Sequence, residues 1–289
     1  MSTRSLRKGS RTAFFALISL TLTGAPVTAQ DPAAPAGLDP GGPAVALIST
    51  GIDYTDPEIA PRLARDGEGE PIAWDFAAND LRPFAASETD NGTRIAKLIL
   101  SVYGNVRLVN VRISQKEPDQ LAKAAMFVAR TPAQIAVVAA NPNDVIGWER
   151  FGEAARGAGG NVLFLVPDEV ASEKGNGHAY PVQLNLENVM TVAPLPTNHS
   201  GQTDPLSGAV DAWIKPRAFS TLGSDAEPAI APANGIEAAA MLAGFAACVL
   251  DGRDVTQAAV MRSTLQENAV AANEGAPKNI YDPVCGDGN

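Results

Sequence analysis

Residues 44–59 read Ala-Val-Ala-Leu-Ile-Ser-Thr-Gly-Ile-Asp-Tyr-Thr-Asp-Pro-Glu-Ile, and this stretch decides the fold. Its first five residues are continuously apolar, and Ser49-Thr50-Gly51 ends the run. A strand buried on both faces of a parallel sheet has this pattern, because neither face meets water and a turn must follow. The stretch therefore predicts an interior strand whose carboxyl end leads into a polar loop.

Similar runs and helical patterns alternate along the rest of the chain. Strands are predicted at residues 106–113, 134–140, 161–166 and 188–193. Helices are predicted near residues 93–101, 119–129, 148–158, 234–250 and 255–268. Such alternation is typical of a doubly wound, mostly parallel sheet with helices on both faces, a three-layer α/β/α domain. Ligands of these domains bind at the carboxyl ends of the strands.

The two ends of the chain differ from this middle part. Residues 1–29 contain four basic residues and then an apolar run from Thr12 to Leu22, as in a secretory signal peptide. Proline and glycine dominate residues 30–43, which predicts a linker. We expect one domain over residues 44–275 and a tail over 276–289. Whether the leader is cleaved before Gln30 or retained as an anchor stays open, but no later segment is apolar enough to span a membrane.

Charge and cysteine content limit the possible partners and compartments. Loss of residues 1–29 would move the net charge from −10 to −14, since only basic charges are lost. Such a surface repels nucleic acid, so a nucleic-acid partner is not expected. The only cysteines are Cys248 and Cys285, which in a periplasmic or secreted protein form either a disulfide or two free thiols.

Three short motifs resemble the signatures of subtilisin-like serine peptidases. The sequence Ser49-Thr-Gly-Ile resembles the family's Asp-Thr-Gly-Ile, and Asn91-Gly-Thr-Arg-Ile-Ala96 resembles His-Gly-Thr-x-Val-Ala. Residues 234–244, ending in Ala-Gly, resemble the family's serine-bearing helix. Residues 162–168, 180–181, 188–193 and 219–222 match other family segments in order. The resemblance implies a subtilisin-like fold over nearly the whole chain beyond the leader.

The residues that carry catalysis in that family are replaced here. The resemblance assigns Ser49 to the position of the catalytic Asp, Asn91 to that of the His, and Ile236 to that of the nucleophilic Ser. Counting forward along the third motif gives Glu237 instead, which is not a serine either. An amide cannot act as general base, and neither Ile nor Glu can replace the serine hydroxyl.

The oxyanion position is altered as well. Asp168 stands where the family has an Asn that donates a hydrogen bond to the oxyanion. A carboxylate accepts rather than donates and would repel the developing negative charge. The only histidines, His178 and His199, lie in unrelated predicted loops. We therefore predict a degenerate site without catalytic residues.

Metal and cofactor chemistry is not expected either. Asp53, Asp56 and Glu58 form an acidic cluster, but their spacing fits no calcium loop and a solvated turn explains them better. Two cysteines and two histidines without close pairs do not form a zinc site. The sequence contains no dinucleotide or phosphate-binding motif.

These observations favour an exported pseudoprotease that binds a peptide or protein partner. In the family, substrate pairs as a strand with the segment that corresponds here to Ala139-Ala140-Asn141, through backbone groups that need no triad. Two alternatives stay open. One is an active endopeptidase with displaced residues, such as Ser49 or Ser220 with His199. The other is a structural subunit of an envelope complex.

Overall fold

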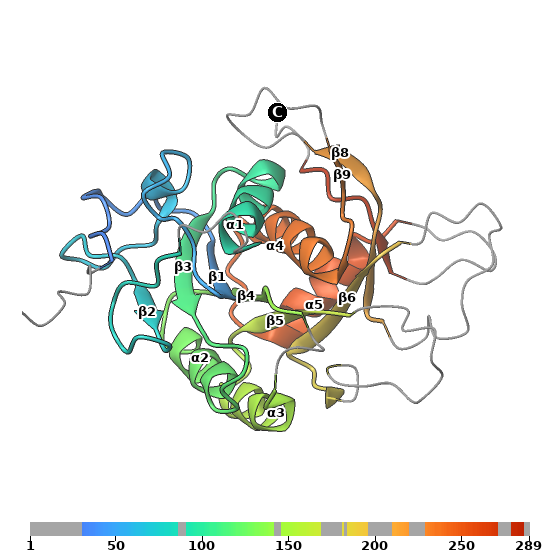
Figure 1. Cartoon of the computed structure of the whole chain (residues 1–289). Coiled ribbons are helices and arrows are strands. Elements are labelled where there is room, and N and C mark those ends of the chain that lie inside the picture. The colour runs from blue at the N-terminus through green and yellow to red at the C-terminus, as the bar shows by residue number, and fades with distance from the viewer. Residues whose placement is uncertain are drawn as a thin grey trace, which may run out of the picture. The chain divides into compact units, whose positions relative to one another are not determined.

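The computed structural model describes residues 31–85, 91–141, 146–168, 181, 184–195, 210–219, 229–270 and 279–285. Eight of its strands form one parallel sheet, in the order β10-β7-β6-β5-β4-β1-β3-β2 (Figure 1). The strands are β1 (Ala44–Ser49), β2 (Ala73–Asp75), β3 (Arg107–Arg112), β4 (Ile135–Val138), β5 (Leu163–Pro167), β6 (Val189–Pro194), β7 (Ala212–Ile214) and β10 (Ile280–Tyr281). A separate antiparallel pair is formed by β8 (Arg217–Phe219) and β9 (Ala229–Ala231).

Helices cover both faces of the sheet, as the alternating pattern predicted. On one face lie α1 (Asn91–Val102), α4 (Gly235–Leu250) and α5 (Ala258–Glu267). On the other lie α2 (Gln120–Val128) and α3 (Trp148–Gly157), and a short 3-10 helix, η1 (Ala60–Arg62), precedes β2. Every strand and helix predicted from the sequence is present, with bounds that differ by a few residues. The three-layer α/β/α fold is therefore confirmed.

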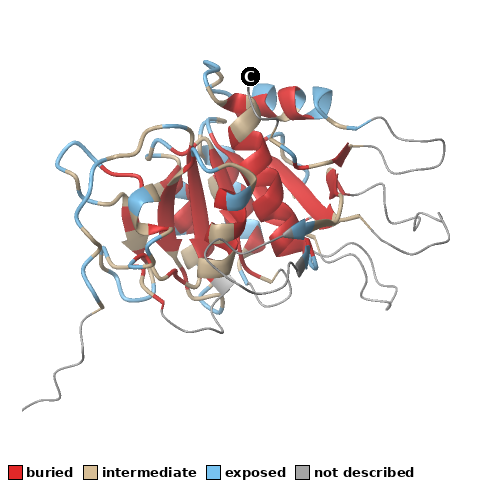
Figure 2. Ribbon diagram, turned by 90° about the horizontal axis from the view of Figure 1, so that it is seen from above, coloured by how far each residue is buried: buried red, intermediate tan, exposed pale blue. Residues whose placement is uncertain are grey.

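Alternate side chains of each central strand point into two different cores. On β1, Val45 and Leu47 join the cluster under α1, α4 and α5, whereas Ala46 and Ile48 join the cluster under α2 and α3. Because both sets are buried, the five residues of β1 before Ser49 are all apolar, and the interior of the domain is buried throughout (Figure 2). The sequence pattern that predicted an interior strand has this cause.

Residues 31–39, which we call the N-terminal strap, lie against the domain without forming a helix or strand. The hydroxyl of Tyr54 donates to the carbonyl of Pro32 at 2.6 Å, and Ala34 packs on the main core. Asp39 accepts hydrogen bonds from the backbone of Arg65 at 2.8 Å and from the guanidinium of Arg107 at 3.0 Å. Burial opposes ionisation of Asp39, but these bonds outweigh it and lower its pKa. The segment predicted as a linker is thus held on the domain.

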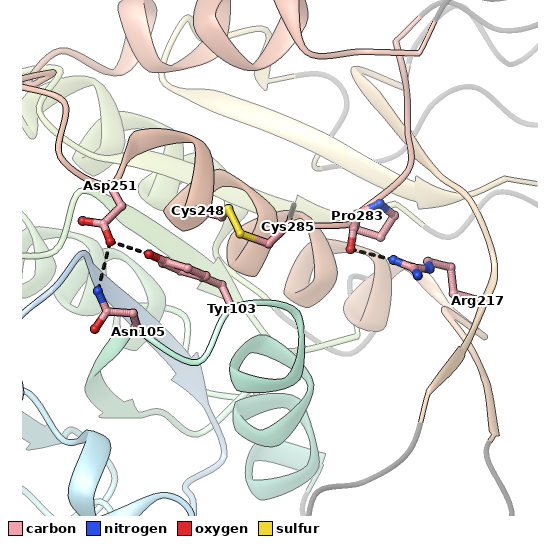
Figure 3. The surroundings of a disulfide bond; sticks show 7 residues. All are labelled: Tyr103, Asn105, Arg217, Cys248, Asp251, Pro283 and Cys285. Carbon is pink, nitrogen blue, oxygen red and sulfur yellow. Dashed lines mark hydrogen bonds between the residues drawn. A yellow bond between two sulfur atoms is a disulfide. The ribbon is translucent and has the colours of Figure 1, made fainter. Parts of the chain in front are cut away.

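The last described residues are also attached to the domain. β10 pairs in parallel with β7 at the edge of the sheet, and Tyr281 is buried against Phe245. Cys285 forms a disulfide with Cys248 near the end of α4, with the two Cα atoms 6.0 Å apart (Figure 3). Close by, the hydroxyl of Tyr103 donates to Asp251. The described part of the predicted tail, residues 279–285, thus contributes a strand and a covalent link.

Two sequence predictions lie wholly or partly outside these residues. The leader, residues 1–29, is not described, so its cleavage or retention stays a prediction, as do the domain boundaries at 44 and 275. Within the described ranges, no helix combines the length and apolar character needed to cross a membrane.

Replacing Cys248 and Cys285 together by Ala should lower the free energy of unfolding by about 4 kcal/mol. The disulfide joins residues 37 apart in sequence, and opening a loop of that length returns chain entropy to the unfolded state. Urea unfolding followed by circular dichroism measures the change. Ser263→Ala, in the same loop, is the control and should cost little. Equal stability of the cysteine variant and the control would contradict the prediction.

Candidate functional site at the carboxyl edge of the sheet

Three predicted site positions lie at the carboxyl ends of neighbouring central strands. Ser49 ends β1, Ala139 follows β4, and Asp168 follows β5. Ser49 is fully buried, and its Oγ accepts a hydrogen bond from the backbone N–H of Gly51 at 3.1 Å. That bond fixes the turn at which the chain leaves the sheet. The hydroxyl at this position therefore stabilises a loop.

Helix α1 begins directly beside Ser49. A Cβ at Gly92 would lie 2.0 Å from the carbonyl oxygen of Gly51 and 2.9 Å from the Oγ of Ser49. Only glycine permits this approach, which brings the position of Asn91 next to that of Ser49. Thr93 strengthens the contact, because its Oγ1 accepts from the backbone N–H of Asp53 at 2.8 Å. The side chain of Asn91 itself lies outside the described part of the chain.

Helix α4 begins beside Asp168. A Cβ at Gly235 would lie 2.5 Å from the carbonyl oxygen of Asp168 and 3.0 Å from its backbone nitrogen. The backbone N–H of Asp168 donates to Val192 at 2.8 Å, which ties this segment to β6. Ile236 is the next residue of α4 and is buried. Close backbone contacts thus bring together the positions of Ser49 and Asn91 and, separately, those of Asp168 and Ile236.

An ion pair between α1 and α4 connects these two halves of the site. The guanidinium of Arg94 binds the carboxylate of Glu237, whose side chain is only 4% exposed, compared with 39% for Arg94. Glu237 also accepts from the backbone N–H of Ala233 at 2.8 Å. Its own N–H donates to the side chain of Asn234, the N-cap of α4, at 3.0 Å. The carboxylate is therefore held by Arg94 and by the backbone of Ala233, and the backbone of Glu237 by Asn234, all at the start of α4.

Sequence reasoning missed this ion pair. Glu237 was considered only as the alternative to Ile236 at the position of the nucleophilic serine, and no role was predicted for Arg94. The Asn-x-x-Glu pattern of residues 234–237 is a capping box, which could have indicated that Glu237 folds back on the helix start. Nothing in the sequence indicated Arg94 as the partner, because 143 residues separate the two.

The acidic cluster on the loop after β1 is occupied by a lysine. The ammonium of Lys97, on α1, lies 2.8 Å from Asp56 and 2.9 Å from Glu58. Burial alone would lower the pKa of Lys97, but hydrogen bonds to the two carboxylates raise it. Asp53 turns elsewhere and accepts from the backbone N–H of Thr55 at 2.9 Å. Asp56, Glu58 and Lys97 form an ion-pair network, and the described residues contain no group of three or more Asp, Glu, His or Cys placed to hold a metal ion.

The predicted peptide-binding segment continues from a central strand. β4 lies between β1 and β5, and the backbone N–H of Ala139 donates to Ile48 at 2.7 Å. The side chains of Ala139 and Ala140 are buried, and Asn141 is partly exposed. A peptide would therefore pair beyond the end of the strand, at the site itself. Residues 142–145 lie outside the described ranges, so this role stays a prediction.

The other candidate catalytic groups are not described. His178, His199 and Ser220 all lie outside the described residues, so the displaced triad stays an open alternative. Two cavities, of about 460 and 710 Å³, lie away from the candidate site. The first is lined by residues at the end of α3, before β5 and β6, and at the start of α5, and the second lies between α2 and α3. Neither borders the positions discussed above.

No model of a known protein family matches the sequence. No curated protein matches it either. Among solved structures, a cold-adapted subtilisin-like serine proteinase superposes with a TM-score of 0.60 at 18% identity, covering 86% of this chain and 92% of that one. This chain has a subtilisin-like fold. The identity is too low to extend the likeness from fold to activity.

Two further similar structures have the same fold in different settings. MycP1 from the ESX-1 type VII secretion system has a TM-score of 0.57 and 20% identity, covering 86% of this chain and 81% of that one. The PatG macrocyclase in complex with peptide has a TM-score of 0.56 and 15% identity, covering 84% and 90%. The subtilisin-like fold at this level of identity thus occurs in proteins of several kinds.

Replacing Arg94 by Ala should lower the free energy of unfolding by about 3 kcal/mol, because it leaves the buried carboxylate of Glu237 without its counter-charge. Glu237→Gln should cost only about 1 kcal/mol, since Arg94 can turn to water and the amide oxygen can still accept. Urea unfolding measures both changes.

Arg150→Ala is the matched control for this pair of variants. It breaks an ion pair with Asp119 in which both side chains are more than half exposed, so it should cost less than about 1 kcal/mol. Equal losses for Arg94→Ala and Arg150→Ala would contradict the role assigned to the buried pair.

Proposed function

We propose that this chain is an exported, catalytically inactive subtilisin-like protein that binds a peptide or protein partner at the carboxyl edge of its sheet. The observation that carries the proposal is the ion pair of Arg94 with Glu237. It stands at the start of α4, where the resembling family has its nucleophilic serine. A buried carboxylate bonded to its own helix start cannot attack a carbonyl and would oppose negative charge on one.

The surroundings of Ser49 support the inactive assignment. In the resembling family an Asp at this position orients the catalytic histidine. The hydroxyl of Ser49 is buried and accepts from Gly51 in its own turn. It carries no charge to stabilise an imidazolium. Its present bond stabilises the loop and gives it no part in proton transfer.

Peptide binding is supported by the position of the segment Ala139-Ala140-Asn141. This segment leaves a central strand and passes the same edge as Ser49 and Asp168. Strand addition needs backbone donors and acceptors, which do not depend on a catalytic triad. The structurally similar PatG macrocyclase is known in complex with a peptide. We carry this mode of binding over to the present chain as part of the proposal.

Three observations support export to the periplasm or the medium. The first 29 residues have the charge and apolar pattern of a signal peptide. The disulfide between Cys248 and Cys285 suits an oxidising compartment. MycP1, one of the similar structures, comes from a secretion system.

Asn141→Pro should weaken binding of the partner about ten-fold, whereas Asn141→Ala should leave binding nearly unchanged. Proline removes the backbone N–H of the segment with which we propose that the partner pairs, and alanine keeps it. The tagged protein is first used to capture its partner from the exported fraction of its native cell. Calorimetric titration of the identified partner against each variant then measures the change.

The same two variants show whether the partner binds along this segment. Equal affinity of the proline and alanine variants would contradict binding along this segment. A partner that cannot be removed from the native complex without unfolding the chain would favour the structural-subunit alternative. Circular dichroism of both variants is the control for folding.

A further inference from the structure

Three arginines, Arg65, Arg82 and Arg107, bind the N-terminal strap on a surface that we call its groove, and the strap has an Asp at each end. The guanidinium of Arg82 donates to the carbonyl of Asp31 at 2.7 Å, and that of Arg65 donates to the carbonyl of Pro35 at 2.7 Å. Asp39 closes the far end through Arg107 at 3.0 Å. A short peptide rich in proline and alanine is thus held by its carbonyl groups and by both of its carboxylates, since Asp31 also lies 3.9 Å from Arg112.

The contacts of Arg65 depend on the strap. Arg65 is only 5% exposed, and apart from the carbonyl of Gly69 at 2.8 Å its guanidinium bonds to the strap. Gly37 packs so closely on this guanidinium that a Cβ there would lie 3.1 Å from it. Without the strap this guanidinium would lose the bond to Pro35 and the cover of Gly37, and it would be hydrated instead. The strap of a second copy of the chain would make the same contacts.

The connection between strap and domain has the features of a hinge. Gly41 and Gly42 both have positive φ, at 71° and 81°, and stand between Pro40 and Pro43. These two conformations turn the chain back from the strap into β1. A residue other than glycine is strained in this region, so the closed form depends on glycine here. Because the strap precedes every strand, it can leave its groove without unthreading the sheet.

We propose that residues 31–39 exchange between two copies of this chain, each strap filling the groove of the other. Exchange of an identical segment keeps all contacts and changes only the hinge, so it is a low-cost route to a dimer. The groove made by Tyr54, Arg65, Arg82 and Arg107 is then the interface, and its ligand is the same acidic, proline-rich segment of a second copy. This inference is independent of the proposed function.

Gly41→Ala tests the exchange directly. No atom lies within 4 Å of a Cβ at this position, so the substitution acts through the positive φ alone. It strains the closed hinge and not the opened one. The dimer association constant should rise roughly 25-fold or more, because each of two hinges contributes about five-fold. Light scattering after size-exclusion chromatography, over a concentration series brought to equilibrium, measures this constant.

Gly67→Ala is the matched control, since its Cβ also meets nothing within 4 Å and its φ is not positive. It should leave the association constant unchanged. Deleting residues 31–39 in the Gly41→Ala background leaves no segment to exchange and should abolish the dimer. The proposal fails if Gly41→Ala and Gly67→Ala behave alike, if the chain stays monomeric throughout, or if dimers persist after this deletion. Should the deletion variant not fold, the comparison of the two glycine variants still decides.

Discussion

The burial of α4 against the sheet is the constraint on which the rest of the molecule depends. Fourteen of its sixteen residues are buried, most of them alanine or glycine. Its two glycines lie where other elements approach most closely. A Cβ at Gly244 would lie 2.7 Å from the carbonyl oxygen of Ile99 on α1, and one at Gly235 would meet Asp168. Small side chains thus let α1, α4 and the central strands approach to backbone contact.

The two ends of α4 carry the features that distinguish this chain. At its start, Asn234 and Glu237 cap the helix, and Glu237 reaches Arg94 on α1. A negative charge at a helix N-terminus is favoured by the helix dipole, so the ion pair stabilises the helix as well as the crossing. Near its end, Cys248 holds the C-terminal segment through the disulfide. Where the resembling family has free reactive groups, this chain has polar groups bonded to one another. That pairing is why we propose binding rather than hydrolysis.

Local pattern was enough to predict the central strands and the helices that cover them. Continuous apolar runs such as residues 44–48 have a single physical cause, burial on both faces, and predict the fold directly. The short strands had no such signal. β10 has two residues, and its place depends on pairing with β7 and on a disulfide to a distant helix.

The strap was predicted as a linker because its composition cannot build a core. Its attachment depends on Arg65, Arg82 and Arg107, which local pattern does not associate with it. The family resemblance predicted the positions of Ser49, Asn91, Ile236 and Asp168. It did not predict the ion pair that joins α1 and α4.

Reaction with a fluorophosphonate, followed by intact-mass measurement of the purified exported chain, tests the central claim most directly. Such probes add covalently to a serine only where a base and an oxyanion hole activate it. The account predicts no adduct after prolonged incubation with excess probe, while an active subtilisin-like enzyme treated in parallel is fully modified. A stoichiometric adduct that disappears in one Ser→Ala variant, with Ser49 and Ser220 tested first, would contradict it.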